Sequence, residues 1–130
     1  SLHESELLEA INNIIEITQK TSGIKINLQA CGFDESLICD KLKLSIYRII
    51  QEQFNNILKH AGAEKIIVRL YQDKEKTLLS IKDDGAGFDS SKKAKGVGLI
   101  NIKTRASLFN GEMIVISSPG NGCELRVLFN

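Results

Sequence analysis

Apolar residues recur at every third or fourth position in three stretches of the chain, and this spacing predicts three amphipathic helices. The first is expected over residues 4–20. The second and longest is expected over residues 40–61, with Asp40 as its N-cap and Gly62 as the residue that stops it. The third is expected over residues 99–109.

In five other stretches apolar and polar residues alternate, which is typical of strands that bury one face. These stretches are residues 24–30, 66–71, 77–83, 113–116 and 123–129. A loop over residues 72–76 is expected to join the second strand to the third, and a turn over 117–122 to join the last two. Helices and mostly antiparallel strands, partly segregated along the chain, predict an α/β sandwich of two layers.

The composition fits one globular domain, residues 1–130, and excludes several other classes. A formal net charge of +1 gives no basic surface for nucleic acid or for a membrane. No apolar run reaches the roughly 18 residues that a membrane-spanning helix needs. The cysteines are odd in number and lack a C-x-x-C spacing, which favours free thiols in a reducing compartment. We therefore expect a cytoplasmic domain, and its helix-like start without methionine indicates a fragment of a longer chain.

The long central helix carries three polar groups in one column, Glu52, Asn56 and Lys59, opposite its apolar face. The amide oxygen of Asn56 is a hard ligand of the kind that Mg²⁺ accepts, and the ammonium of Lys59 can neutralise phosphate charge. The carboxylate of Glu52, one turn from Asn56, can orient or deprotonate an attacking group. A solvated helix face with stabilising side-chain pairs is the alternative interpretation. The apolar face is expected to pack on the sheet through Ile46, Ile50, Phe54, Ile57 and Ala61.

The strand that ends at Asp83 places this carboxylate on its buried face, whereas Asp84 points to the other face. A carboxylate at the end of a buried row is costly unless it meets a donor, and the exocyclic amine of adenine is a suitable one. Gly85 and Gly87 would let the backbone approach the base closely and adopt a positive φ. An ordinary Asp-Gly surface turn is the alternative.

A glycine-containing segment, residues 96–99, opens the third helix, and such a helix start offers free backbone N–H groups to phosphate. The irregular stretch before it, residues 85–96, carries three lysines and can fold over phosphate groups. Helix starts use glycine for other reasons as well, and the spacings of the dinucleotide-binding and P-loop motifs are absent. The order of these segments along the chain indicates a site for ATP with Mg²⁺.

Together the segments resemble the boxes of the ATP-binding catalytic domain of sensor histidine kinases, in the superfamily that also contains gyrase, the ninety-kilodalton heat-shock chaperone and MutL. The resemblance covers about residues 5–129 and is greatest for the nitrate/nitrite- and lipid-fluidity-sensor-like subfamily. Residues 47–61 resemble the N box, 83–88 the G1 box and 96–99 the G2 box, and 119–123 fall where the last glycine box lies. The resemblance implies a Bergerat fold, in which a mostly antiparallel mixed sheet carries helices on one face and ATP lies between them under a lid.

The resemblance also implies roles for single residues. Asp83 would bind the adenine amine, Asn56 would bind Mg²⁺ and Glu52 would occupy the catalytic polar or base position. The glycines of residues 96–98 would shape the lid. The expected nucleotide-binding residues are Asn56, Lys59, Asp83, Gly85, Gly87, Gly96, Gly98 and Leu99.

Two features depart from the family pattern. The last box usually reads Gly-Thr and here reads Gly122-Cys123, and a thiol is a weaker donor than a hydroxyl for any hydrogen bond that supports Asp83. The phosphoacceptor helix is also missing, because neither His3 nor His60 lies in a sequence like the His-Asp acceptor box. We expect His60 to be a structural histidine at the end of its helix.

The leading hypothesis is a histidine kinase catalytic domain that passes the γ-phosphoryl group of ATP to a histidine on an upstream dimerisation domain, and thence to a response regulator. The full-length protein would form the homodimer and could carry a membrane anchor, and the domain itself would contact neither nucleic acid nor membrane. An anti-sigma-factor-type serine kinase is the enzymatic alternative, because Glu52, Asn56 and His60 also match its spacing. A non-catalytic module, in which ATP only sets the conformation of the lid, is the alternative from another class.

Overall fold

The computed structural model describes residues 6–90 and 97–130, which form three α-helices, one short 3₁₀ helix and five strands. Every helix and strand expected from the sequence is present, with ends that differ by no more than two residues. In chain order they are α1 (Glu6–Ser22), β1 (Lys25–Gln29), the 3₁₀ helix η1 (Glu35–Leu37), α2 (Asp40–His60), β2 (Lys65–Asp73), β3 (Lys76–Asp83), α3 (Val97–Ser107), β4 (Glu112–Ser117) and β5 (Cys123–Phe129).

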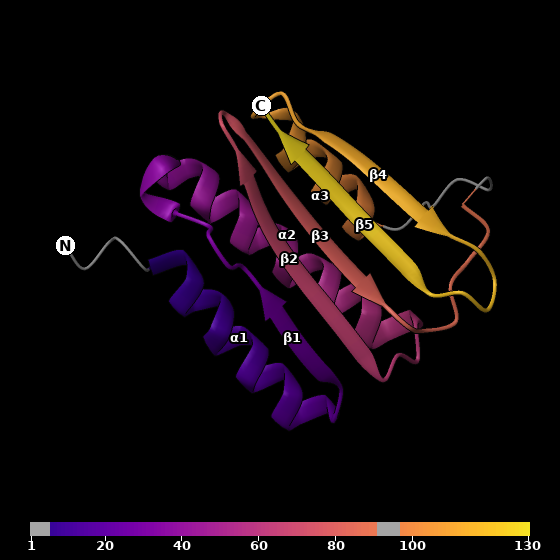
Figure 1. Cartoon of the computed structure of the whole chain (residues 1–130). Coiled ribbons are helices and arrows are strands. Elements are labelled where there is room, and N and C mark those ends of the chain that lie inside the picture. The colour runs from indigo at the N-terminus through magenta and orange to yellow at the C-terminus, as the bar shows by residue number, and fades with distance from the viewer. Residues whose placement is uncertain (1–5, 91–96) are drawn as a thin grey trace.

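The strands form one sheet in the order β1-β2-β3-β5-β4. The edge strand β1 runs parallel to β2, and the other three neighbouring pairs are antiparallel. In the view of Figure 1, α2 crosses behind β2 and β3, α3 lies behind β5, and α1 lies alongside the edge strand β1. The expected two-layer fold, with a mostly antiparallel mixed sheet and helices on one face, is confirmed.

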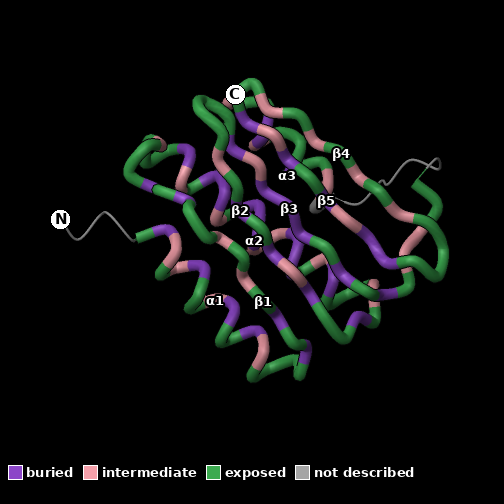
Figure 2. The backbone as a smooth tube through the Cα atoms, viewed as in Figure 1, coloured by how far each residue is buried: buried purple, intermediate pink, exposed green. Residues whose placement is uncertain are grey.

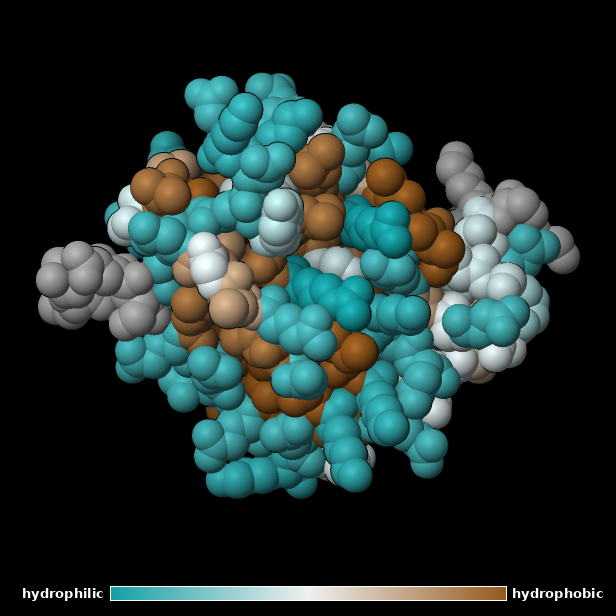
Figure 3. Space-filling model, viewed as in Figure 1, coloured by the Kyte–Doolittle hydropathy of each residue, from teal (hydrophilic) through white to brown (hydrophobic). Residues whose placement is uncertain are grey.

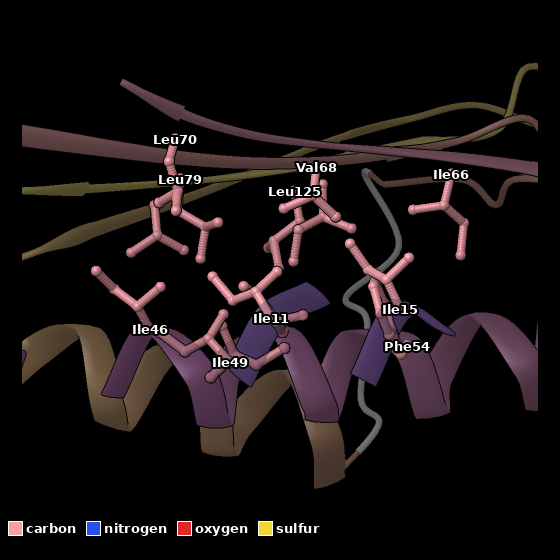
Figure 4. Packing of buried hydrophobic residues seen from close by; sticks show 14 of the residues in the cluster. Ile11, Ile15, Ile46, Ile49, Phe54, Ile66, Val68, Leu70, Leu79 and Leu125 are labelled. Atoms are coloured by element: carbon pink, nitrogen blue, oxygen red, sulfur yellow. The ribbon is translucent and has the colours of Figure 1, made fainter. Parts of the chain in front are cut away.

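The hydrophobic core fills the space between the sheet and the helices. Figure 4 shows Ile46 and Ile49 of α2 pointing toward Leu79 on the sheet, while Ile11 and Ile15 of α1 enter the same cluster. Along the strands buried and exposed residues alternate, as the colours of Figure 2 show. Burying one such aliphatic side chain contributes roughly 1.5–3 kcal/mol. The expected apolar face of α2 is confirmed, since Ile46, Ile50, Phe54 and Ile57 are buried and Ala61 is half-buried.

The second face of the sheet mixes charged and apolar side chains, and Figure 3 shows this mixture from the front. One row across the strands runs from Ile67 through Lys82 and Glu124 to Ile116. Within the part of the chain that the structure describes, no helix covers this face. No helix there is long and apolar enough to cross a bilayer.

The ends of α2 correct one expectation and confirm another. Cys39 occupies the N-cap position, with extended backbone and no side-chain capping bond, so the prediction of Asp40 as the cap was wrong. The Asp40 carboxylate instead lies 3.7 Å from the ammonium of Lys43, one turn further along the helix. At the other end Gly62 has a φ of +60°, which confirms it as the stop.

The connection between β2 and β3 is shorter than expected. The strands remain paired as far as Asp73 and Lys76, so only Lys74 and Glu75 form the turn, and Lys74 has a φ of +53°. The predicted five-residue loop was wrong because three of its polar residues, Gln72, Asp73 and Lys76, lie on paired strands. Polarity alone does not distinguish a loop from an exposed strand end.

The 3₁₀ helix η1, which the sequence pattern did not predict, fastens α1 to the beginning of α2. The Glu35 carboxylate is buried and accepts hydrogen bonds from the backbone N–H groups of Leu7 (2.7 Å) and Leu8 (3.0 Å). The ammonium of Lys43 lies 3.8 Å from the same carboxylate. Glu35 therefore satisfies N–H groups that the first turn of α1 leaves without helical partners.

Candidate functional site

The site expected from the sequence is centred on the end of β3. The Asp83 side chain is 3% exposed, and its Oδ1 accepts a hydrogen bond from the Gly85 N–H at 2.8 Å. Burial raises the pKa of Asp83, and the neighbouring Asp84 charge acts in the same direction against the hydrogen bond from Gly85. The expected burial of Asp83 on the core face is confirmed, and this burial destabilises the ionised form of the carboxyl.

Asp84 points to the opposite face, as expected, and serves the backbone. Its exposed carboxylate accepts hydrogen bonds from the N–H groups of Glu64 (2.8 Å) and Lys65 (2.9 Å). The hydrogen bond from Lys65 is the main cause that lowers the pKa of Asp84. Asp84 thus fixes the entry of the chain into β2, while Asp83 faces the interior.

The glycines after Asp83 pack against protein backbone. A Cβ on Gly85 would overlap the carbonyl of Ala61 at the end of α2, and the neighbouring Ala86 N–H donates to that same carbonyl at 2.7 Å. A Cβ on Gly87 would overlap the carbonyl of Ser118. The expected positive φ is found at Gly87 (+67°), but the expectation was wrong for Gly85. Position 85 requires glycine because its backbone lies against Ala61. This contact joins the G1-like loop to α2.

Cys123 lies directly opposite Asp83 on the neighbouring strand β5. Burial, with the Asp83 charge beside it, raises the pKa of the Cys123 thiol to about 11, so the thiol stays protonated at neutral pH. The hydroxyl that organises the adjacent loop belongs to Ser117, which donates to the Gly122 carbonyl at 2.7 Å and accepts from the Phe88 N–H at 2.9 Å. Ser117 was not among the residues expected from the sequence.

The polar column on α2 lies where the sequence predicted. Glu52 and Asn56 are half-buried and Lys59 is exposed. The Asn56 Nδ2 donates to the Gln53 Oε1 at 3.2 Å, which turns the Asn56 Oδ1 away from Gln53. His60, expected to be a structural histidine, is exposed in the last turn of α2.

The donor set on α2 is compatible with a magnesium ion that is held mainly by a ligand. Among the described residues no three His, Cys, Asp or Glu side chains form a metal cluster. One amide oxygen from Asn56, completed by phosphate oxygens and water, fits the preference of Mg²⁺ for few protein ligands.

The start of α3 holds part of the expected phosphate-binding segment. The helix begins at Val97, two residues before the predicted start, and includes Gly98 and the half-buried Leu99, which packs against the core. Gly96 and the lysines before it lie outside the described residues. The phosphate-binding and lid roles of this segment remain predictions.

A groove of about 440 Å³ runs along the outward side of α2, between α1 and an arginine of α3. Sequence reasoning missed it because residues from three helices form it. The exposed Arg48 and the half-buried Arg105 border it, and Glu52 contributes to its wall. Its lining residues are Ile14, Thr18, Arg48, Gln51, Glu52, Phe54, Asn55, Leu58 and Arg105.

Residues 41–130 match the family of histidine kinase-, DNA gyrase B- and HSP90-like ATPases. This match covers more than half of the chain, and the chain belongs to this ATPase family. The expected family and the expected fold are therefore confirmed.

Sensor histidine kinases are similar to this chain over most of its length. MctS of Rhizobium johnstonii is 37% identical over 101 residues, which cover 75% of this chain and 22% of MctS. DegS of Bacillus subtilis, a histidine-protein kinase/phosphatase, is 31% identical over 133 residues, which cover 98% of this chain and 34% of DegS. The chain thus spans about a third or less of these relatives, and within the family it is a catalytic domain of the histidine kinase type.

Solved structures of histidine kinases share the fold. Full-length ShkA in complex with AMPPNP superposes with a TM-score of 0.79 at 18% identity, covering 96% of this chain and 29% of ShkA. AdeS of Acinetobacter baumannii gives a TM-score of 0.78 at 14% identity, covering 97% of this chain and 64% of AdeS. The similar proteins are sensor kinases, so they do not favour the serine-kinase alternative.

Proposed function

We propose that this domain binds ATP as its Mg²⁺ complex and presents the γ-phosphoryl group to a histidine on a separate dimerisation domain. The proposal rests on the buried Asp83 carboxylate, which precedes a loop that is hydrogen-bonded from Ala86 to Ala61 at the end of α2, the helix that carries the polar column. One end of the site thus offers an acceptor for a base amine, and the other offers groups for phosphate and cation.

Asp83 would recognise the adenine end of the nucleotide. Its buried carboxylate has a raised pKa, so a hydrogen bond from a neutral N–H donor would offset part of the cost of its burial. Gly87, with its positive φ, and Gly85 hold the loop that would border the base. ShkA, whose structure is similar, was solved in complex with the ATP analogue AMPPNP, and this supports a nucleotide as the ligand of the domain.

The outward column of α2 would serve the phosphate end. Asn56 would supply its Oδ1 to Mg²⁺, and Lys59 would neutralise phosphate charge. Bound ATP supplies the transferable γ-phosphoryl group, which leaves the β–γ bridging oxygen as a nitrogen of the acceptor imidazole forms the new N–P bond. Glu52 would orient the acceptor imidazole by accepting a hydrogen bond, or the proton, from its other ring nitrogen.

The wider partners follow from the same proposal. The relatives are about three or more times longer than the matched segment, so further domains of the parent protein would provide the acceptor histidine and the dimer contact. The phosphoryl group would pass from that histidine to a response regulator. The domain would act on the cytoplasmic side, whether or not the parent protein is anchored in a membrane.

Two titrations by calorimetry test the binding site. Asn56→Ala should weaken binding of Mg²⁺·AMPPNP by about tenfold or more, as expected for the loss of a contact to a charged group, and should change binding of metal-free ADP little. Equal losses in both titrations would assign Asn56 a structural role instead of a metal-binding one.

A transfer assay tests the reaction. With radiolabelled ATP the isolated domain should remain unlabelled, whereas an acceptor-domain polypeptide from the same parent protein should gain an acid-labile label on histidine. Glu52→Gln should slow this transfer strongly and change ATP affinity little, because the group acts mainly in the transition state. Label on a partner's serine, or on the isolated domain itself, would overturn the proposal.

A further inference from the structure

The two edge strands of the sheet differ in how well they are protected from pairing with another strand. The edge strand β1 has five residues, and its exposed positions carry Lys25, Asn27 and Gln29. In Figure 1 the helix α1 also lies alongside this strand. Short length, lysine and a covering element are means by which proteins keep an edge strand from pairing, so β1 is a protected edge.

The opposite edge strand, β4, lacks these features. It has six residues, of which only the first, Glu112, is charged, and it pairs with β5 residue for residue without a bulge as far as Ser117. Ile114 is 46% exposed and Ile116 is 47% exposed, both on the face of the sheet that no described helix covers. Within residues 6–90 and 97–130 no strand pairs with the outer side of β4. Alternate residues of an antiparallel strand direct their N–H and C=O groups away from the paired neighbour, so β4 offers a template for another strand.

The charged groups beside the two isoleucines compensate each other within one chain. Ile114 lies opposite Arg126 on β5, and Ile116 lies opposite Glu124. The Arg126 Nε donates to the Glu124 Oε2 at 2.8 Å, and this pairing is the main cause that lowers the pKa of Glu124. Because the two charges balance locally, an identical surface can approach this edge without repulsion between like charges.

The sequence of β4 is complementary to itself in antiparallel orientation. Residues directly opposite each other in such a pair lie on the same face of the sheet. A two-fold axis at Val115 places Ile114 opposite Ile116 of the second copy, and Ile116 opposite the second copy's Ile114. The two Glu112 side chains stay at opposite ends of the paired segment, so they do not meet. β-branched side chains facing each other across strands are a stabilising combination.

We propose that a second copy of this chain pairs with β4 in antiparallel orientation about a two-fold axis at Val115, so that the two sheets become one continuous sheet. Ile114 and Ile116 of both copies then form one apolar cluster on the uncovered face. A six-residue strand is only about 20 Å long, and the contact is smaller than the roughly 800 Å² per partner of a stable interface. The pairing is therefore a concentration-dependent equilibrium. It uses none of the residues to which the proposed function assigns a role, so the two stand or fall separately.

Sedimentation velocity over a wide range of protein concentrations tests the pairing. The chain carries its own hydrophobic core, and the unchanged chain should pass from monomer to dimer as its concentration rises. Ile114→Lys and Ile116→Lys should each raise the dissociation constant of the dimer about tenfold or more, because the symmetry introduces each lysine twice. The matched controls are Ile17→Lys on α1, 62% exposed, and Tyr71→Lys on the same face of the sheet at β2, 61% exposed. Both controls should stay within about twofold of the unchanged chain.

Hydrogen exchange gives a readout of the backbone that does not depend on the substitutions. Amides of residues 112–117 that exchange rapidly in dilute protein should become protected as the concentration rises, whereas amides of β1 should not change. Cysteine cross-linking tests the register, after the exposed Cys31 and Cys39 have been replaced with serine. Under mild oxidation, Ile114→Cys mixed with Ile116→Cys should form a disulfide-linked dimer more readily than either variant alone.

Each contrary result overturns a defined part of the proposal. A chain that stays monomeric at every concentration, or β4 amides whose exchange does not depend on concentration, would overturn the strand pairing. Loss of the dimer in Tyr71→Lys as well as in Ile116→Lys would indicate packing of the two uncovered faces and would also overturn it. Self-linking of Ile114→Cys that is as efficient as linking in the mixture would overturn the register about Val115.

Discussion

Two buried carboxylates, at opposite ends of the domain, have very different surroundings. Glu35 is 2% exposed and Asp83 is 3% exposed, so burial alone does not distinguish them. Glu35 accepts two backbone N–H groups at the positive end of α1 and has the ammonium of Lys43 nearby. Asp83 accepts the Gly85 N–H and has the carboxylate of Asp84 next to it.

The difference is the one expected between a structural carboxylate and a carboxylate that binds a ligand, which is the role we propose for Asp83. The contacts of Glu35 compensate its charge within the protein, so it contributes to the folded state. The charge of Asp83 is compensated by fewer protein groups, and its pKa is raised. A bound donor would supply the hydrogen bond that the protein does not provide. Replacing each residue in turn should therefore affect stability in one case and ligand binding in the other.

Replacing Glu35 should have the largest effect. Glu35→Ala should lower the free energy of unfolding by about 3 kcal/mol, because two N–H groups of α1 lose their acceptor and Lys43 loses a buried counter-charge. Urea denaturation measures this loss. Glu16→Ala on α1, which breaks only the exposed pair with Lys20, should change the free energy of unfolding by less than about 0.5 kcal/mol. Equal losses of unfolding free energy in Glu35→Ala and Glu16→Ala would contradict a structural role for Glu35.

Replacing Asp83 should affect nucleotide binding, whereas replacing Glu35 should affect the stability of the fold. Asp83→Asn should weaken adenine-nucleotide binding by about tenfold or more, since a charge-assisted hydrogen bond is worth about 1.5–3 kcal/mol. Its thermal midpoint without ligand should stay equal or rise, because a buried charge with a raised pKa has been removed. Calorimetry and thermal unfolding on one sample measure both. A large fall in the midpoint would place Asp83 with Glu35 as a structural residue.

Asp84 offers the control within the same motif, and its effect should be smaller. Asp84→Asn should lower the unfolding free energy by less than about 1 kcal/mol, since its two backbone hydrogen bonds lie at the surface. Nucleotide affinity, measured by the same calorimetry, should not change. Weaker nucleotide binding in Asp84→Asn than in Asp83→Asn would reverse the assignment of the two side chains.

The pH dependence of stability should distinguish Asp83 from Asp84, and this is the smallest of the expected effects. The pKa of Asp83 is raised in the folded state. The contribution of its protonated form to stability is therefore fully present below the unfolded pKa of about 3.9, and it is lost as pH rises through the higher folded pKa. The pKa of Asp84 is lowered, so its contribution is present above the unfolded value and is lost as pH falls through the folded value. Lowering the pH from 7 should therefore remove both the advantage of Asp83→Asn and the deficit of Asp84→Asn in unfolding free energy. Differences that stay constant with pH would contradict both assignments.

The sequence predicted the features that depend on the local period of a helix or a strand. The side of β3 on which Asp83 lies follows from the two-residue period of a strand, and the buried face of α2 follows from the helical period. The two-residue turn at Lys74 escaped prediction because polar strand ends resemble loops. The role of Glu35 could not be predicted, since its partner Leu7 is 28 residues away in the chain. The groove beside Arg105 likewise depends on how three helices pack, which no single period records.

The backbone packing of the glycines has a consequence for recognising inactive relatives. Gly85, Gly87 and Gly122 each lie against a carbonyl that a methyl group would overlap, and all three contacts are made by the protein itself. A descendant that had lost its chemistry but kept its fold would face the same steric constraint at these positions. Glycines here therefore report an intact scaffold, and loss of function in such a relative would be recognised at positions 52, 56 and 83, the side chains for which we propose roles in transfer, metal binding and adenine binding.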